Sequence, residues 1–143
     1  MKLLKSCVSI WFLFGSAAAQ ASDWRIVTVD GAAAVGEASI GFRADGSYSG
    51  NTGCNLFQGQ ARYEGGQLVI EGPMAHTKKA CADDALVAQE AAIVGMFAGT
   101  MDIRFDPLSH TMTVLQDDRS LVLARLDDEP GSEPDASDVP SDP

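Results

Sequence analysis

The candidate nucleophiles, neutral-pH bases and metal ligands of this chain include three cysteines and two histidines. Cys54 lies in a glycine-rich stretch, residues 50–59, with the sequence GNTGCNLFQG, and Cys81 ends the segment HTKKAC. Glycine at this density is typical of backbone that needs a positive φ or a close approach. A cysteine in such a turn can be a nucleophile, a metal ligand or half of a disulfide.

Catalysis by a thiol requires a base near the sulfur, and His76 and His110 are the only neutral-pH bases of the usual kind. Cys81 precedes a predicted helix, whose N-terminus would favour the thiolate. The cysteines and histidines lack the C-x-x-C and H-x-x-x-H spacings of zinc sites, and no G-x-S-x-G, phosphate-loop or H-E-x-x-H motif occurs. The scattered carboxylates single out no acid–base pair. We therefore expect no catalytic, cofactor-binding or metal-binding residues.

The first 21 residues have the three parts of a secretory signal. Two lysines come first, an apolar run follows over residues 8–14, and small residues end the segment. The A-x-A patterns predict cleavage after Ala21, with Ala19 as the alternative. The apolar run is too short to span a bilayer. We therefore expect a periplasmic or secreted protein without a membrane span.

Export also bears on the cysteines. Cys7 would leave with the signal, so the mature chain would keep only Cys54 and Cys81 in a compartment where disulfides persist. Two such cysteines most simply pair with each other. The chain-entropy model gives a loop of this length roughly 3.5 kcal/mol of stabilisation.

The C-terminal segment differs from the rest of the chain in its charge and composition. Residues 127–143 are acidic and proline-rich and contain no basic residue, so we expect a disordered tail. The formal net charge of −10 argues against nucleic acid as a partner, because nucleic-acid binders need basic patches. The folded part is therefore predicted to be one domain over residues 22–126.

Apolar residues in this domain alternate mostly with period two. The alternation predicts eight strands, at residues 24–29, 38–43, 47–50, 57–64, 67–72, 101–106, 111–116 and 120–126. Residues 82–99 are alanine-rich and predict a helix, with Asp83 or Asp84 as N-cap and with Gln89 and Glu90 interrupting its apolar stripe. We place Glu90 at the solvated edge of that stripe. The fold class is therefore α+β: a strongly bent antiparallel sheet or partly open barrel of about eight strands, with one helix between the fifth and sixth strands.

Two motifs resemble those of the META domain family of the HslJ type (heat-shock protein HslJ). They are Gly53-Cys54-Asn55, followed by an aromatic residue and a glycine, and T-x-x-A-C at residues 77–81, which begins at Thr77. Trp24 in the first strand and Glu90 in the helix add to the resemblance. The resemblance implies a small α+β domain of bacterial envelope and secreted proteins, linked to heat shock, motility and drug tolerance, with no established enzymatic activity. It also implies pairing of the two motif cysteines.

Three functions follow as hypotheses. The first is an exported, non-enzymatic, monomeric envelope protein that acts in stress by binding an envelope protein or a ligand. The second is a carrier of a small apolar ligand such as a lipid, because a bent sheet closed by a helix can enclose a cavity. Its adaptable lining would come from Met74, Met96, Phe97, Met101 and Met112. The third is an enzyme with an unrecognised carboxylate site, which needs two convergent acids with perturbed pKa values.

Overall fold

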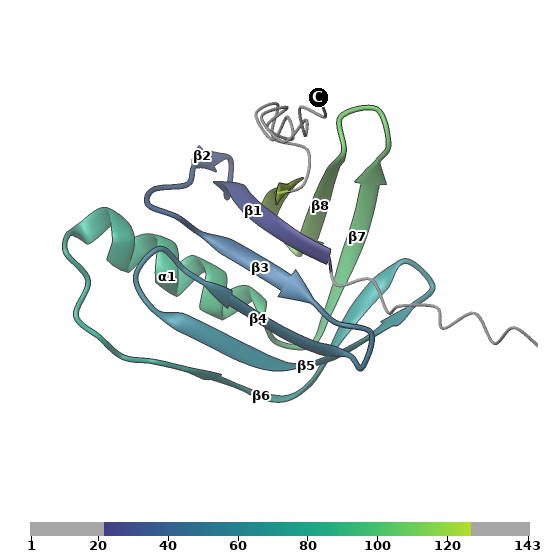
Figure 1. Ribbon diagram of the computed structural model, residues 1–143, viewed down its shortest axis with the longest axis horizontal. Coiled ribbons are helices and arrows are strands. Elements are labelled where there is room, and N and C mark those ends of the chain that lie inside the picture. The colour runs from purple at the N-terminus through teal and green to yellow at the C-terminus, as the bar shows by residue number, and fades with distance from the viewer. Residues whose placement is uncertain (1–21, 127–143) are drawn as a thin grey trace, which may run out of the picture.

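The computed structural model describes residues 22–126, and their strands form a closed antiparallel barrel (Figure 1). Each strand of the barrel pairs with the strands on either side of it, in the order β1-β3-β4-β5-β6-β7-β8-β9. The barrel strands are β1 (Ser22–Val29), β3 (Ser39–Phe42), β4 (Ser47–Asn51), β5 (Leu56–Glu64), β6 (Gln67–His76), β7 (Thr100–Asp106), β8 (Thr111–Gln116) and β9 (Arg119–Arg125). The predicted signal, residues 1–21, and the predicted tail, residues 127–143, lie outside the described residues.

Pairing between the first and last strands closes the barrel. β1 lies antiparallel to β9, with Trp24 opposite Arg125 and Val29 opposite Leu121. The expectation of an open sheet or a partly open barrel is therefore wrong. Closure pairs the two edges that an open sheet would expose, and the residues involved are too far apart in sequence for alternation to reveal their contact.

The strand count also differs from the prediction. A two-residue strand, β2 (Ala32–Ala33), folds back on β1 after the Asp30–Gly31 turn. Because of it, α1 (Asp84–Met96) follows the sixth strand in chain order, between β6 and β7, and does not lie between the fifth and sixth strands. Two alanines carry no alternation that could predict a strand.

Helix α1 is shorter than the predicted span of 82–99, and its N-cap is one of the two predicted. The Asp83 carboxylate accepts a hydrogen bond from the Leu86 amide (2.9 Å), which satisfies a backbone donor of the first turn. Strand β6 is longer than predicted and runs past Gly72 and Pro73, because a register shift against β5 accommodates the irregular backbone there.

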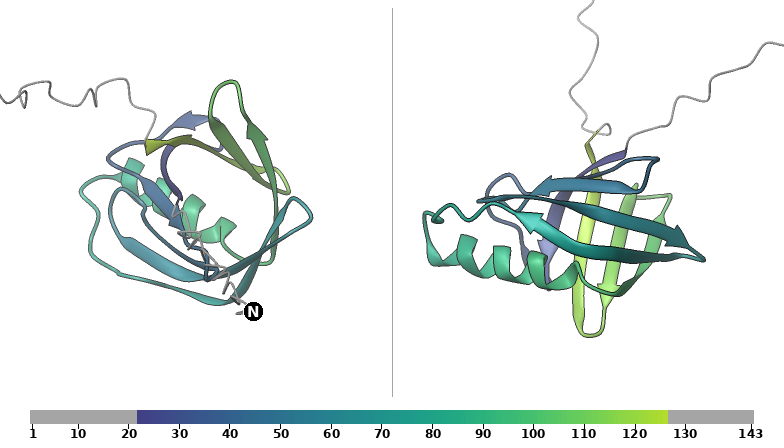
Figure 2. Two further views of the ribbon diagram at one scale, coloured as in Figure 1. Left: turned by 45° about the vertical axis from the view of Figure 1, so that its right-hand side comes forward. Right: turned by 90° about the horizontal axis from the view of Figure 1, so that it is seen from below.

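The helix lies across one end of the barrel (Figure 2). Ile93, Met96 and Phe97 are buried, and the Phe97 ring lies 5.1 Å from the Tyr48 ring and 5.5 Å from the Phe57 ring. Arg119, the first residue of β9, donates to Ala92 O of the helix (3.1 Å) at this end of the barrel. Within residues 22–126, no helix lies over the opposite end of the barrel.

Two glycines allow the aromatic residues to fill the barrel. Gly59 faces Tyr48 and Gly50 faces Phe57 across the β4–β5 ladder. A Cβ on Gly59 would collide with the Tyr48 phenol, and a Cβ on Gly50 would collide with the Phe57 ring. Each ring therefore occupies the space that a neighbouring side chain would need. Burial also raises the pKa of the Tyr48 phenol.

Candidate functional site

The predicted disulfide is present. Cys54 and Cys81 are bonded, with their Cα atoms 5.5 Å apart, and they tie the β4–β5 turn to the segment that leads into α1. Glu90 Oε2 lies 3.1 Å from Cys81 Sγ. The two sulfurs and this carboxylate lie close enough to hold a metal, but a sulfur in a disulfide is neither a thiolate ligand nor a nucleophile.

Asn55, next to Cys54, is the centre of a hydrogen-bond network. Its side chain is buried at 2% exposure. Nδ2 donates to both Glu90 carboxylate oxygens (2.9 Å each) and to Lys79 O (3.0 Å), while Oδ1 accepts from the Thr77 hydroxyl (2.9 Å) and from Lys79 N (2.7 Å). Both motifs of the sequence therefore meet at one amide, which uses all its donors and acceptors.

The helix contributes two polar residues to this region, and the sequence analysis placed both at an interruption of the apolar stripe. Gln89 is instead buried, and it donates to Thr52 O (2.6 Å) and Val35 O (2.9 Å) and accepts from Val35 N (2.7 Å). Glu90 is half-buried against Asn55. Helical periodicity alone could not show that Gln89 faces backbone groups of the β2–β3 and β4–β5 connections, or that Glu90 faces the side-chain amide of Asn55.

Gly53 lies at the edge of the same network. Its φ is +97°, and a Cβ there would approach Val35 O and the Gln89 amide. The structure thus brings together Gly53, Asn55, Thr77 and Glu90 around the disulfide. Trp24, the fifth motif residue, lies elsewhere, inside the barrel. We interpret the Asn55 network, formed by Asn55, Thr77, Lys79 and Glu90, as stabilising the fold, because its polar groups are already paired with one another.

The two histidines are not brought together. His76 ends β6 beside the disulfide, and its Nδ1 lies 3.0 Å from Thr77 O. His110 lies in the turn between β7 and β8, at the other end of the barrel, with φ +52°. No histidine pair of the kind that a zinc site would need is formed.

A cavity opens at the barrel end opposite α1, and we call it the mouth. Its volume is about 400 Å³. The lining is mostly apolar and comes from strands on all sides of the barrel: Trp24, Phe42, Leu68, Ile103, Phe105 and Met112. Phe105 is 54% exposed and meets Trp24 edge to face, with ring centroids 6.2 Å apart. Tyr63, 69% exposed, also lines the mouth.

The sequence analysis proposed a different lining for a cavity. Of the five residues it named, only Met112 lines the mouth. Met96, Phe97 and Met101 are buried in the core, and Met74 packs against the core from the side. Along β7, Phe105 alternates with Ile103 and Met101 and therefore shares their face, but the mouth depends on which strands are neighbours around the barrel.

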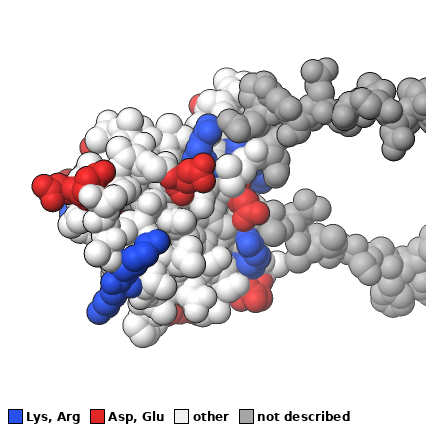
Figure 3. All heavy atoms as spheres, turned by 60° about the vertical axis from the view of Figure 1, so that its left-hand side comes forward, with Lys and Arg blue, Asp and Glu red and all other residues white. Residues whose placement is uncertain are grey.

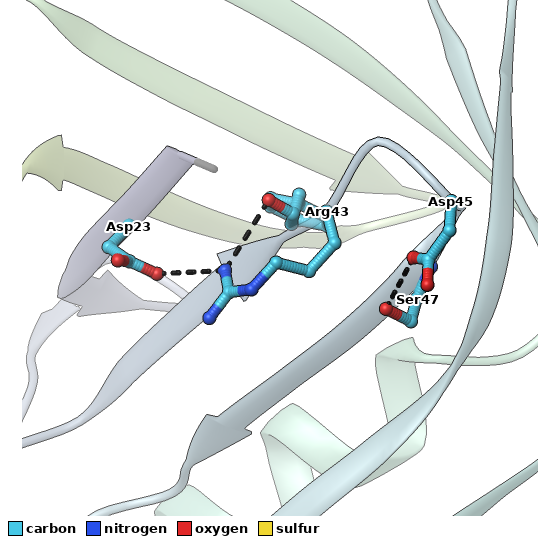
Figure 4. A network of polar contacts seen from close by, with 5 residues as sticks. Asp23, Arg43, Asp45 and Ser47 are labelled. Atoms are coloured by element: carbon cyan, nitrogen blue, oxygen red, sulfur yellow. Dashed lines mark hydrogen bonds and ion pairs between the residues drawn. The ribbon is translucent and has the colours of Figure 1, made fainter. Parts of the chain in front are cut away.

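Two arginines lie at the mouth in different settings. The Arg43 guanidinium turns to the outer face and pairs with Asp23 (3.1 Å), and nearby Asp45 accepts from the Ser47 hydroxyl and amide (Figure 4). The Arg125 guanidinium lies 5.1 Å above the Trp24 ring, a cation–π contact. Trp24 Nε1 is buried and has no hydrogen-bond partner among the described residues.

Other hollows on the described surface have volumes of about 400–520 Å³, but their linings contain at most one aromatic residue each. On the face shown in Figure 3, acidic and basic side chains are interspersed. No helix within residues 22–126 is long and apolar enough to cross a membrane.

Comparison with known proteins supports the fold and the family. The sequence profile of the META domain matches residues 17–128. One solved structure, titled "NMR structure of the protein", is 21% identical with a TM-score of 0.62, and the match covers 72% of this chain and 87% of that one. Another, "NMR structure of the protein from Burkholderia xenovorans", is 19% identical with a TM-score of 0.57, covering 73% of this chain and 81% of that one. Among curated proteins, none matches. The chain belongs to the META domain family.

Proposed function

We propose that this protein is an exported, non-enzymatic binding domain that holds a small apolar molecule in the mouth of its barrel. The observation that carries the proposal is the mouth itself: an aromatic-rich cavity of about 400 Å³ at the barrel end that the helix leaves uncovered. Pockets for small ligands have volumes of roughly 300–1,000 Å³ and mostly apolar walls. Exposed Phe105 and Tyr63 gain burial when such a ligand enters.

Two carboxyl groups have pKa values that shift away from those of a general acid. A general acid at neutral pH needs a carboxyl pKa that burial or a like charge has raised. Hydrogen bonds from Ser47 lower the pKa of Asp45, and the Leu108 amide lowers the pKa of Asp106. Asp45 lies in the β3–β4 turn and Asp106 ends β7, and both are exposed.

The site of action is also proposed. The Cys54–Cys81 disulfide is compatible with an oxidising compartment, and the N-terminal sequence has the pattern of a secretory signal. A periplasmic or secreted, monomeric protein follows as the simplest proposal. A part in envelope stress, implied by the resemblance to HslJ-type proteins, is compatible with a carrier of apolar molecules.

The proposal is tested with N-phenyl-1-naphthylamine, an uncharged dye that fluoresces in apolar sites. Titration of the purified exported chain is expected to give saturable binding. Phe105→Glu places a charge in the mouth and is expected to weaken binding about tenfold, a loss of about 1.4 kcal/mol. Leu56→Glu is the matched control, because Leu56 is a strand residue of similar exposure (59%) at the helix end of the barrel.

Saturable binding that Phe105→Glu weakens and Leu56→Glu leaves unchanged would support the mouth as the site. Absence of saturable binding, or equal loss in both variants, would contradict the proposal. Circular dichroism of each variant establishes that the barrel is folded before the dye is added.

A further inference from the structure

We propose that the molecule held in the mouth is an amphipathic anion, with its apolar tail among the aromatic rings and its head group at Arg125. This inference rests on the proposed function and adds the chemical class of the ligand. Two features of the rim carry it: the position of Arg125 over the mouth, and the absence of a carboxylate partner for Arg125 among residues 22–126.

The barrel register places Arg125 over the mouth. Arg125 lies opposite Trp24 in the β1–β9 ladder, so the two side chains share one face of the sheet. Leu121 and Leu123, at alternate positions of the same strand, are buried inside the barrel. Arg125 continues this inner series at the point where the barrel opens, and its guanidinium covers the Trp24 ring at 5.1 Å.

The charge of Arg125 is not neutralised by the domain. Within residues 22–126, Arg125 forms no ion pair with a carboxylate. Arg43, by contrast, pairs with Asp23, and Arg62 pairs with Glu64 and Glu71. An arginine at the mouth that has no carboxylate partner among residues 22–126 favours an anionic group from solution and disfavours a cationic one.

The experiment compares decanoate with decanol, which have the same tail and differ in charge. Isothermal titration or dye displacement on the full exported chain is expected to give tighter binding of decanoate. Arg125→Gln is expected to weaken decanoate about fivefold and to change decanol less than twofold, because the lost contact is a partly exposed ion pair. Arg125→Lys keeps the charge and is expected to recover part of the decanoate affinity. Arg62→Gln, the same change on the outer face, is the control.

The possible outcomes distinguish failure of the anionic head group from failure of the proposed function. Loss of decanoate binding in Arg125→Gln, with recovery in Arg125→Lys and no change in Arg62→Gln, supports the anionic head group. Equal affinity of the two compounds in the unmodified chain, or an effect as large in Arg62→Gln, overturns the inference while the mouth remains a binding site. Binding of neither compound overturns the proposed function itself.

Discussion

Removal of the buried side-chain amide of Asn55 tests how much its hydrogen bonds stabilise the domain. Asn55→Ala removes an amide that bonds to Glu90, Thr77 and Lys79, and it leaves a buried gap of the same size. A net hydrogen bond contributes about 1 kcal/mol, and the bond to a carboxylate contributes more. Three such partners give a loss of about 3 kcal/mol in the free energy of unfolding. At roughly 4 °C per kcal/mol for a domain of this size, the melting temperature falls by about 12 °C.

The matched control lies in the same turn. Asn51 makes one side-chain contact of this kind, in which its Oδ1 accepts from Gly53 N (2.8 Å). Asn51→Ala is therefore expected to cost about 1 kcal/mol, or roughly 4 °C. Both variants are measured by thermal and urea denaturation without reductant, so that the disulfide stays intact. If the two variants lose the same free energy of unfolding, the Asn55 network does not stabilise the domain to the extent that its hydrogen bonds indicate.

Three further predictions concern the core, the cysteines and the tail. Gly59→Ala should lower the free energy of unfolding by about 2 kcal/mol in urea denaturation, because the added Cβ meets Tyr48. Gly95→Ala, at an exposed position of α1 where the added Cβ meets only the flexible Arg119 side chain, should raise it by about 0.5–1 kcal/mol; equal values would contradict the Tyr48–Gly59 contact. Thiol labelling of the exported protein in denaturant without reductant should find no free thiol, and two labelled thiols would refute the disulfide in the purified protein. Deleting residues 127–143 should shift the melting temperature by no more than about two degrees, and a larger fall would mean that this segment stabilises the domain.

The features that could be predicted from the sequence are local ones. Period-two alternation located the barrel strands within a few residues, and the aspartates before the helix located its N-cap at Asp83. The cysteine count and the predicted export gave the disulfide. Each of these depends on neighbours in sequence or on chemistry that composition reveals.

The features that could not be predicted depend on contacts between distant segments. Closure of the barrel rests on the β1–β9 register, and β2 is too short to carry a pattern. Gln89 is buried only because backbone groups near Val35 and Thr52 meet it. The mouth likewise exists only once Trp24 and Arg125 have become neighbours. Alternation predicts which face a side chain is on, but it does not predict which strand lies beside it.

The ligand-binding mouth is tested most directly by methyl NMR of the protein labelled at its methionines. Met112 lines the mouth, whereas Met96, the last residue of α1, is fully buried in the core and does not line the mouth. Titration with decanol tests the cavity independently of the head group. Saturable movement of the Met112 methyl signal, with the Met96 signal unchanged, is the result that the structure predicts. Movement of Met96 alone, equal movement of both signals, or no movement up to the solubility limit of decanol would contradict a ligand site in the mouth.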